Sequence, residues 1–308
     1  MKGLIVINGY PNGEKFIRQG ERIAQELRIL GVDSDLLKNG EVYAILGTNG
    51  NVATNVNGYD FAVYLDKDKY LGRMLESSGL RLFNSAQAVE TCDDKMLTYL
   101  ALEGAGLHLP KSIAAPLCYT PNASPNLAFL EHVAENLGFP LIAKKSYGSF
   151  GAGVELVHGM PELIKTEAAW LHCPHFYQQY IAQSHGRDVR VLVIGGKAVS
   201  AMERCAQDGE FRSNIELGGI GKRVVLSAEY AQTAERAAKS LKLDYCGVDL
   251  LEGDEGAVIC EVNSNAFFEG LEGVTGANIA RAYAEYIRAE IYKEKKLRQI
   301  CNKKSQKP

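Results

Sequence analysis

The chain lacks several features that would restrict it to particular classes of protein. None of its 308 residues lies in an apolar run that approaches the ~20 residues a membrane-spanning helix requires. Residues 1–8 read as a short strand and lack the small-residue cleavage region of a signal peptide. The seven cysteines are odd in number, scattered and without a C-x-x-C pair, which is typical of reduced thiols. These absences predict a cytoplasmic protein with no disulfide framework and no membrane association.

The chain also lacks an excess of charge and the common nucleotide motifs. The sequence contains 34 basic and 37 acidic residues, so its formal net charge of −3 gives no general attraction to nucleic acid. No G-x-G-x-x-G follows the first strand, and no G-K-[ST] opens a helix. Residues 172–175 contain His and Cys, but Pro174 interrupts them and no second cluster accompanies them, which favours a polar loop over a metal site.

The first part of the chain alternates strand and helix patterns. Residues 4–8 and 61–65 read as buried strands, and residues 16–30 and 71–78 have apolar side chains at helical spacing. This βαβ order is typical of a parallel sheet. A first α/β domain is therefore predicted over residues 1–94.

Three further segments follow. Residues 95–175 are predicted to form a small α+β module, and residues 176–294 a larger and more antiparallel subdomain. One helix is expected from about 90 to 103, because acidic residues open it and a glycine follows its end. The basic segment 295–308 is expected to be frayed and disordered.

Two strands near the C-terminus bring oxygen ligands together. Residues 245–251 and 258–263 are rich in Val, Ile and Leu and flank a Gly/Asp turn, the pattern of a β-hairpin. Glu261 and Asn263 share a strand face, and Asp249 lies nearly opposite on the partner strand. Two carboxylates and an amide oxygen suit a magnesium ion. Solvated strand charges are the alternative explanation.

The hairpin pattern gives a prediction about register. Directly opposed residues of antiparallel strands share a face. In a plain even loop with Glu252 facing Ala257, Asp249 would face Cys260, and Glu261 would point to the other side of the sheet. A shared metal site therefore predicts an odd-length loop or a β-bulge between Asp249 and Glu261.

A glycine-rich loop follows a predicted strand at 140–145. The strand ends in two lysines, and the loop contains Gly148, Gly151 and Gly153 before a second strand begins. Glycines let backbone N–H groups approach phosphate oxygens, and Lys144 would supply positive charge. The strand–loop–strand setting favours a lid over a nucleotide, and a flexible β-turn is the alternative.

Polar groups between this loop and the hairpin suit the rest of a nucleotide. The backbone of residues 178–181 could pair with an adenine edge, and Asp188 could accept hydrogen bonds from ribose hydroxyls. Arg212 could neutralise charge on a transferred phosphoryl group. Ion pairs explain Asp188, Arg190 and Arg212 equally well.

The order of these motifs resembles the ATP-grasp superfamily and, within it, the RimK-type α-L-glutamate ligases. The resemblance extends over essentially residues 1–292. The pieces that read like the family, in the same sequence and spacing, are residues 191–193, 201–204, 211–214, 218–219, 247–249, 261–263 and 271–280.

The resemblance implies a fold and a set of ligands. The fold is α/β, with α+β character in the C-terminal half: a Rossmann-like pre-ATP-grasp domain, a lid and a C-terminal subdomain. ATP and two magnesium ions are implied, with manganese as an alternative metal. Residues implied to contact ATP are Lys95, Lys144, Ser146, Gly148, Gly151, Gly153, Gln178, Gln179, Tyr180, Ile181, Asp188, Arg212, Ser213 and Asn214. Arg212 and Asn214 are the implied catalytic residues, and Asp249, Glu261 and Asn263 the implied metal ligands.

The resemblance also implies an activity. ATP phosphorylates a carboxylate to an acyl phosphate, and an amine then displaces phosphate to give an amide. The expected reaction adds glutamate or a similar amino acid to a carboxyl acceptor, which is a protein C-terminus or a small molecule. One alternative is a ligase for another metabolite, a coenzyme tail or a carrier-protein C-terminus. The other is a non-catalytic ATP-binding interaction protein of synapsin-like type.

The chain departs from the family pattern on the acceptor side. Residues 264–269 read Ser-Asn-Ala-Phe-Phe-Glu where a RimK enzyme commonly has Ala-Ser-Pro-Gly. Glu216 and Leu217 stand where the ribosomal-protein-modifying member carries basic residues, and Gln179 stands where an acid is frequent. The first two departures leave the acceptor open. The oligomeric state, including a homo-oligomer, is open as well.

Overall fold

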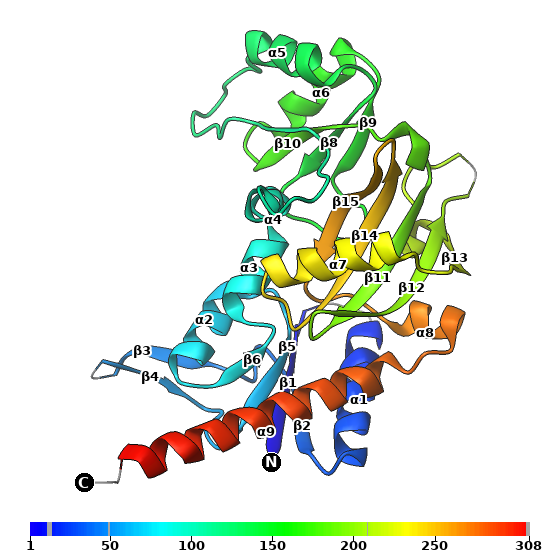
Figure 1. Ribbon diagram of the computed structural model, residues 1–308. Helices are drawn as coiled ribbons and strands as arrows, with labels where there is room; N and C mark the ends of the chain where they lie inside the picture. The colour runs from blue at the N-terminus through cyan, green and yellow to red at the C-terminus, as the bar shows by residue number, and fades with distance from the viewer. Residues whose placement is uncertain (11–13, 49, 208, 306–308) are drawn as a thin grey trace.

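Three parts of the chain are stacked along the long dimension of Figure 1, with the N-terminal domain at the bottom, a five-stranded sheet in the middle and a lid at the top. The computed structural model describes residues 1–10, 14–48, 50–207 and 209–305. The fold class predicted from the alternation of patterns is present: a parallel sheet comes first and antiparallel sheets follow.

The N-terminal sheet is parallel, in the order β2-β1-β5-β6. Its central strands are almost wholly apolar and buried, as expected where helices cover both faces. A separate hairpin, β3–β4, projects from this domain (Figure 1). The elements are β1 (Lys2–Ile7), α1 (Glu14–Ile29), β2 (Asp33–Lys38), β3 (Ala44–Thr48), β4 (Asn51–Thr54), β5 (Phe61–Leu65), α2 (Lys69–Ser77) and β6 (Arg81–Phe83).

Two short helices lead out of this domain, α3 (Ala86–Asp93) and α4 (Lys95–Leu102). Asp94 between them has extended backbone, and its carboxylate accepts hydrogen bonds from two backbone N–H groups of the next turn. Aspartate is a preferred N-cap because it satisfies these otherwise free donors. The prediction of one helix from 90 to 103 is therefore wrong, and Asp94 places Lys95 at the start of a second helix.

The lid is an antiparallel sheet in the order β7-β10-β8-β9 with its own apolar core. Strand β10 pairs with lid strands on both sides, so the predicted boundary after residue 175 is wrong and the lid continues to Gln179. The N–H group of Gln179 donates to the carbonyl of Lys111 over 2.8 Å, so the chain enters and leaves the lid at adjacent points. The elements are β7 (Ser112–Ala114), α5 (Leu127–Leu137), β8 (Leu141–Lys145), β9 (Val154–Val157), α6 (Met160–Trp170) and β10 (His175–Gln179).

The start of the lid also differs from the predicted residue 95. Leu102 of α4 is buried in the same apolar cluster as Ala234 and Ala238 of α7, outside the lid. Helix α4 therefore packs on the C-terminal sheet, and the lid begins near Lys111.

The C-terminal sheet is antiparallel, in the order β13-β12-β11-β14-β15. Buried alanines of α7 pack against strand residues such as Val248 and Ile259. Small side chains let the helix approach the sheet closely. The elements are η1 (Ala182–Ser184), β11 (Arg187–Ile194), β12 (Lys197–Cys205), η2 (Ile215–Leu217), β13 (Ile220–Arg223), α7 (Ala228–Ser240), β14 (Tyr245–Gly253), β15 (Gly256–Asn263) and α8 (Glu269–Thr275).

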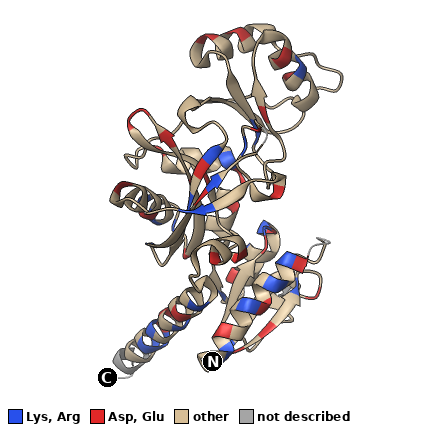
Figure 2. Ribbon diagram, turned by 90° about the vertical axis from the view of Figure 1, so that its right-hand side faces the viewer, with Lys and Arg blue, Asp and Glu red and all other residues tan. Residues whose placement is uncertain are grey.

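The last helix, α9 (Ile279–Ser305), returns to the N-terminal domain and lies along α1. Its buried Ile287 and Ile291 join the core of the first sheet, and Lys295 forms a 2.7 Å ion pair with Asp60. The prediction of a disordered tail is wrong as far as Ser305, because Lys, Arg and Glu favour helix (Figure 2). Residues 306–308 of that tail lie outside the described residues. Among the helices described, none is both long and apolar enough to cross a membrane.

Candidate active site

The β14–β15 hairpin contains the predicted irregularity. Glu252 faces Ala257 across the turn, but the register shifts between Asp249 and Leu250, so Asp249 pairs with Glu261. Cys260 is the extra residue of this bulge. Asn263 lies two residues beyond Glu261 and therefore on the same face. The prediction of a bulge that brings these oxygen-bearing side chains to one face is confirmed.

The carboxylate of Asp249 is held by two arginines. Arg190 donates from Nε to Oδ1 over 2.7 Å and from a terminal nitrogen to Oδ2 over 2.8 Å. Arg204 lies 2.8 Å from Oδ2. Burial alone would raise the pKa of the Asp249 carboxyl, but the two guanidinium groups outweigh it and hold the pKa at about 2. Asp249 is therefore ionised, although it is only 2% exposed.

Glu261 is placed quite differently. Its side chain is 27% exposed, and it forms an ion pair with Lys95 at 3.3 Å. Asn263 borders the larger of two cavities described below, and its buried amide nitrogen has no hydrogen-bond partner among the described residues. A buried amide that the protein leaves unsatisfied is a feature of sites that hold a further group.

The three predicted metal ligands fit a magnesium ion unequally. Glu261 is partly exposed and bound by Lys95, and the amide of Asn263 borders the same cavity. Asp249 has about four lone-pair positions, of which the arginines use three. One position on Oδ1 remains for a cation. No group of three or more His, Cys, Asp or Glu side chains in the described ranges could hold a metal, so a magnesium ion here would take its other ligands from the Asn263 amide, phosphate oxygens or water.

Asp188, the predicted ribose contact, forms a buried ion pair. Arg204 donates from Nε to its Oδ1 over 2.7 Å, and Asp188 pairs with Arg204 across strands β11 and β12. Arg204 thus lies between the Asp188 and Asp249 carboxylates. Asp188 also borders the smaller cavity, so the ion-pair explanation is confirmed and the ribose contact stays a prediction.

The glycine-rich loop connects β8 to β9 above this sheet. Gly151 has φ +76°, and a Cβ there would meet Leu217 at 3.0 Å and Asn214 at 3.1 Å. Only glycine fits such a left-handed, crowded position. Lys95 donates from Nζ to the carbonyl of Gly148 over 2.8 Å while pairing with Glu261, so one side chain links the loop to the hairpin.

Two predicted loop residues lie away from the cavity walls. Ser146 is buried, and its backbone N–H and C=O bond to Pro174 and Lys95. The carbonyl of Gly153 accepts from the N–H of Lys145 over 2.8 Å. Both positions close the loop and border neither of the two main cavities.

A smaller cavity of about 110 Å³ lies between the lid and the C-terminal sheet. Predicted residues that border it are Lys95, Lys144, Gly148, Gly151, Gln178, Gln179, Tyr180, Ile181, Asp188, Arg212, Ser213, Asn214, Asp249 and Glu261. Residues that are far apart in the sequence therefore line the same cavity. Arg212 donates to the carbonyl of Gly151 over 3.0 Å, and its hydrogen bonds hold the pKa of the Glu210 carboxyl at about 2.

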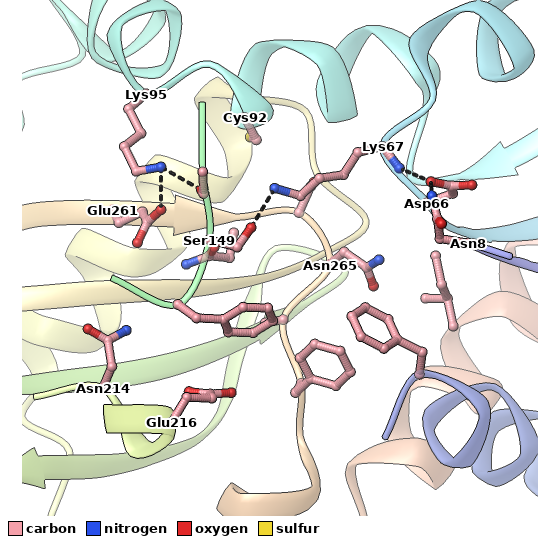
Figure 3. A pocket seen from close by; sticks show the side chains of 18 of the residues that line it. Asn8, Asp66, Lys67, Cys92, Lys95, Ser149, Asn214, Glu216, Glu261 and Asn265 are labelled. Atoms are coloured by element: carbon pink, nitrogen blue, oxygen red, sulfur yellow. Dashed lines mark hydrogen bonds and ion pairs between the residues drawn. The ribbon is translucent and has the colours of Figure 1, made fainter. Parts of the chain in front are cut away.

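A larger cavity of about 450 Å³ adjoins it and reaches the N-terminal domain. In Figure 3, Lys95 and Glu261 lie on one side of this cavity and Asn8 and Asp66 on the other. Asn8 and Asp66 follow β1 and β5, at the carboxyl ends of adjacent parallel strands, where ligands of α/β sheets bind. The two cavities meet at shared wall residues: Lys95, Gly148, Ser149, Asn214 and Glu261.

Sequence reasoning missed several members of this site. It gave no partner to Arg204, and it did not single out Asn8, Asp66 or Lys67. A usable signal was present for Arg204, because a charged residue inside an otherwise apolar strand requires a buried partner. The N-terminal residues carry no comparable signal, because only the domain arrangement brings them to the site.

Comparisons with known proteins agree with this geometry. The family model described as a RimK-like ATP-grasp domain matches residues 92–287. Beta-citrylglutamate synthase B of Homo sapiens is 34% identical over 253 residues, covering 77% of this chain and 64% of that protein. A "Probable alpha-L-glutamate ligase" of Marinomonas sp. is 36% identical over 217 residues, 70% of this chain and 69% of the relative. The chain spans only 55% of the length of beta-citrylglutamate synthase B of Danio rerio.

Solved structures show the same fold at low identity. D-alanine–D-alanine ligase from Bacillus anthracis complexed with ATP has a TM-score of 0.70 and 19% identity, covering 97% of this chain and 99% of that one. A RimK domain protein from Sphaerobacter thermophilus has a TM-score of 0.70 and 17% identity over 93% of this chain and 99% of that one. The α/β ATP-grasp fold predicted from the sequence is confirmed. The family match over most of the chain confirms the predicted resemblance as well: the chain belongs to the RimK-like ATP-grasp family.

Proposed function

We propose that the chain is a magnesium- and ATP-dependent ligase that joins a carboxylate to an amine. The observation that carries this proposal is the shared border of the two cavities at Lys95, Gly148 and Glu261. A nucleotide in the smaller cavity would direct its terminal phosphate to that border. A carboxylate in the larger cavity would meet it there.

The proposed reaction has two steps. A carboxylate oxygen attacks the terminal phosphorus of ATP, the bond to the leaving ADP oxygen breaks, and an acyl phosphate forms. An amine then attacks the acyl carbon, and phosphate leaves with the electron pair of the broken C–O bond. Positioning and charge stabilisation dominate such phosphoryl transfers.

Each proposed role follows from a placement described above. Lys144 and the loop at Gly148 and Gly151 would face the phosphates, and residues 178–181 would face the base; all of them border the smaller cavity. Arg212 contacts the same loop and would stabilise charge that grows as phosphate transfers. Magnesium, when bound by Glu261 and Asn263 with the free position of Asp249, would offset phosphate charge.

The amine substrate is proposed to be an amino acid. Two relatives that match this chain over 69% and 73% of their own length are named "Probable alpha-L-glutamate ligase" and "Probable alpha-L-glutamate ligase 2", which supports glutamate as the first amine to test. Two ions per site and the acyl phosphate are part of the proposal.

The test is release of ADP from Mg-ATP in the presence of pooled amino acids and pooled N-acetylated carboxylates, with mass spectrometry of the product. Glu261→Gln should lower ADP release by roughly a hundredfold, because a ligand for phosphate-bound metal is lost. Glu255→Gln is the matched control, because Glu255 is 83% exposed at the turn of the same hairpin. Tight Mg-ATP binding without turnover in any pool would favour a non-catalytic ATP-binding protein.

A further inference from the structure

Three phenyl rings from three parts of the chain meet at the larger cavity. Phe16 lies in α1, Phe150 lies in the loop between β8 and β9, and Phe267 follows β15. The ring centroids of Phe16 and Phe267 are 5.0 Å apart, edge to face, and those of Phe150 and Phe267 are 6.1 Å apart. We call these three rings the aromatic wall. They give one part of a mixed polar and apolar cavity a continuous aromatic surface.

Phe150 is held in an unusual backbone conformation. Its φ is +60°, in the left-handed region that bulky side chains rarely adopt. Core burial does not explain the choice of Phe, because the residue is 37% exposed. A large side chain kept in such a conformation at the edge of a cavity indicates a role for the ring itself.

Lys15 fixes the wall from outside the cavity. Its Nζ lies 3.7 Å from the centroid of the Phe150 ring and 4.8 Å from that of Phe267. The same ammonium group lies 3.2 Å from Glu216. This cation–π and ion-pair contact sets the orientation of the rings before any substrate enters.

The charges around the larger cavity are already neutralised. Three basic side chains border it, and each has a carboxylate partner: Lys67 at 2.6 Å, Lys95 at 3.3 Å and Arg190 at 2.7 Å. Three acidic side chains border it as well, so the formal charge of its walls is zero. Within the described ranges, no unpaired cation lines this cavity to receive a second carboxylate of a substrate.

Apolar rings and neutral charge together restrict the substrate. We propose that the molecule whose carboxyl group is phosphorylated carries a single carboxylate and an apolar side chain, which packs on the aromatic wall. An N-acylated apolar amino acid or the apolar end of a peptide is the class that fits. The volume of about 450 Å³ lies in the range for a small organic ligand.

The geometry places the two ends of this substrate. Its carboxylate lies at the border with the smaller cavity, beside Lys95 and Glu261, where the phosphate would arrive. Its side chain lies against Phe150 and Phe267, whose edges and faces accept aromatic or branched aliphatic groups. This inference rests on the proposed ligase activity.

The experiment compares acceptors of equal charge at the reacting end. ADP release is measured with Mg-ATP, pooled amino acids as amines, and one of four carboxylates: N-acetyl-L-phenylalanine, N-acetyl-L-leucine, N-acetyl-L-aspartate or N-acetyl-L-glutamate. The apolar pair should give kcat/KM at least tenfold higher than the acidic pair. Equal or better turnover of the acidic pair would overturn this proposal while leaving the ligase activity intact.

Variants connect that preference to the rings. Phe267→Ala should lower kcat/KM for N-acetyl-L-phenylalanine by roughly tenfold to a hundredfold, with little change for the acidic pair. Phe150→Asn removes the second ring but keeps a residue that tolerates the left-handed backbone. Tyr292→Ala, at a 61% exposed position of α9, is the control. Equal losses of kcat/KM for apolar and acidic acceptors would overturn the proposed apolar subsite. The rings would then serve only to position the β8–β9 loop.

A binding measurement decides the case in which nothing turns over. Calorimetry with N-acetyl-L-phenylalanine, in the presence of magnesium and a non-hydrolysable ATP analogue, does not depend on the reaction. Binding that weakens at least tenfold in Phe267→Ala would support the apolar subsite even if the proposed ligase activity failed. No binding to the unaltered chain would overturn it.

Discussion

The two cavities share a border but obtain their walls in different ways. At the floor of the smaller one, Asp188, Arg204 and Asp249 are buried and fix one another through ion pairs across neighbouring strands. The larger one receives rings and amides from all three parts of the chain, among them Asn8 and Phe267. Strand pairing holds the floor of the first, which the lid covers from the other side, and segments of all three parts of the chain meet in the second.

The carboxylates of the hairpin show the same difference within a few ångströms. Asp249 is 2% exposed and bound by two arginines, whereas the Glu261 side chain is 27% exposed and bound by one lysine. Asp249 holds the floor together, and Glu261 faces the place where the cavities meet. Four experiments can break or sharpen this contrast.

The largest expected effect is on stability. Asp249→Ala leaves Arg190 without its carboxylate and Arg204 with Asp188 alone, and removing one partner of a buried pair costs about 3–5 kcal/mol. Glu261→Ala should cost less than about 1 kcal/mol, because its partner Lys95 keeps a hydrogen bond to the loop. The free energies of unfolding from urea titrations measure both. Equal losses in the free energy of unfolding would mean that the two carboxylates contribute equally to stability, which would contradict their different burial.

Arg212→Ala should act on the reaction and leave the fold intact. If Arg212 stabilises charge that grows only during phosphoryl transfer, kcat falls by roughly a hundredfold with little change in ATP affinity. Arg298→Ala, at an exposed position of α9, is the control for loss of one arginine. Weaker ATP binding with normal kcat would make Arg212 a contact of the bound nucleotide and not of the transition state.

Gly151→Val should weaken ATP binding by roughly tenfold, because the new side chain occupies space beside Asn214 and holds the loop away from the phosphates. Gly138→Val is a matched control, since Gly138 also has positive φ but nothing within 4 Å of the added Cβ. The two variants should have similar melting temperatures without nucleotide. A much lower melting temperature for Gly151→Val alone would assign the glycine a purely structural role.

The smallest effect concerns acid. The folded pKa of Asp249 is about 2 and lies below its unfolded value of about 3.9, so its contribution to stability is complete above about pH 5. That contribution declines as the pH falls from about 5 to about 1, by about 1 kcal/mol between pH 4 and pH 3. Urea unfolding at a series of pH values, compared with Asp249→Asn, isolates this slope. A variant with the same acid profile as the unaltered chain would contradict the assignment.

Local rules were enough to predict the register of the β14–β15 hairpin beside the smaller cavity. Strand alternation requires a bulge if Asp249 and Glu261 are to share a face, and Cys260 provides it. The β8–β9 loop likewise predicts a lid by itself, because its glycines allow close approach of the backbone and the lysines before it supply positive charge. Such features depend on neighbours that are close in sequence or paired in one sheet.

Long-range packing was not accessible in the same way. Strand β10 could be assigned to the lid only from its pairing with β7 and β8, and α9 gains its order from α1 and the first sheet. The aromatic wall combines three segments that no periodicity connects. These parts depend on where whole domains lie, which a local pattern does not encode.

The hydrogen bond between Gln179 and Lys111 has a consequence for the architecture of the whole chain. Because the chain enters and leaves the lid at adjacent points, residues 112–179 form an insertion with neighbouring ends and a separate core. In the rest of the molecule, helix α9 packs on the first sheet and so returns the C-terminal part of the chain to the N-terminal domain. The lid is therefore a body whose two chain ends lie side by side. Evolution or an engineer can exchange such a body for another without interrupting the chain that remains.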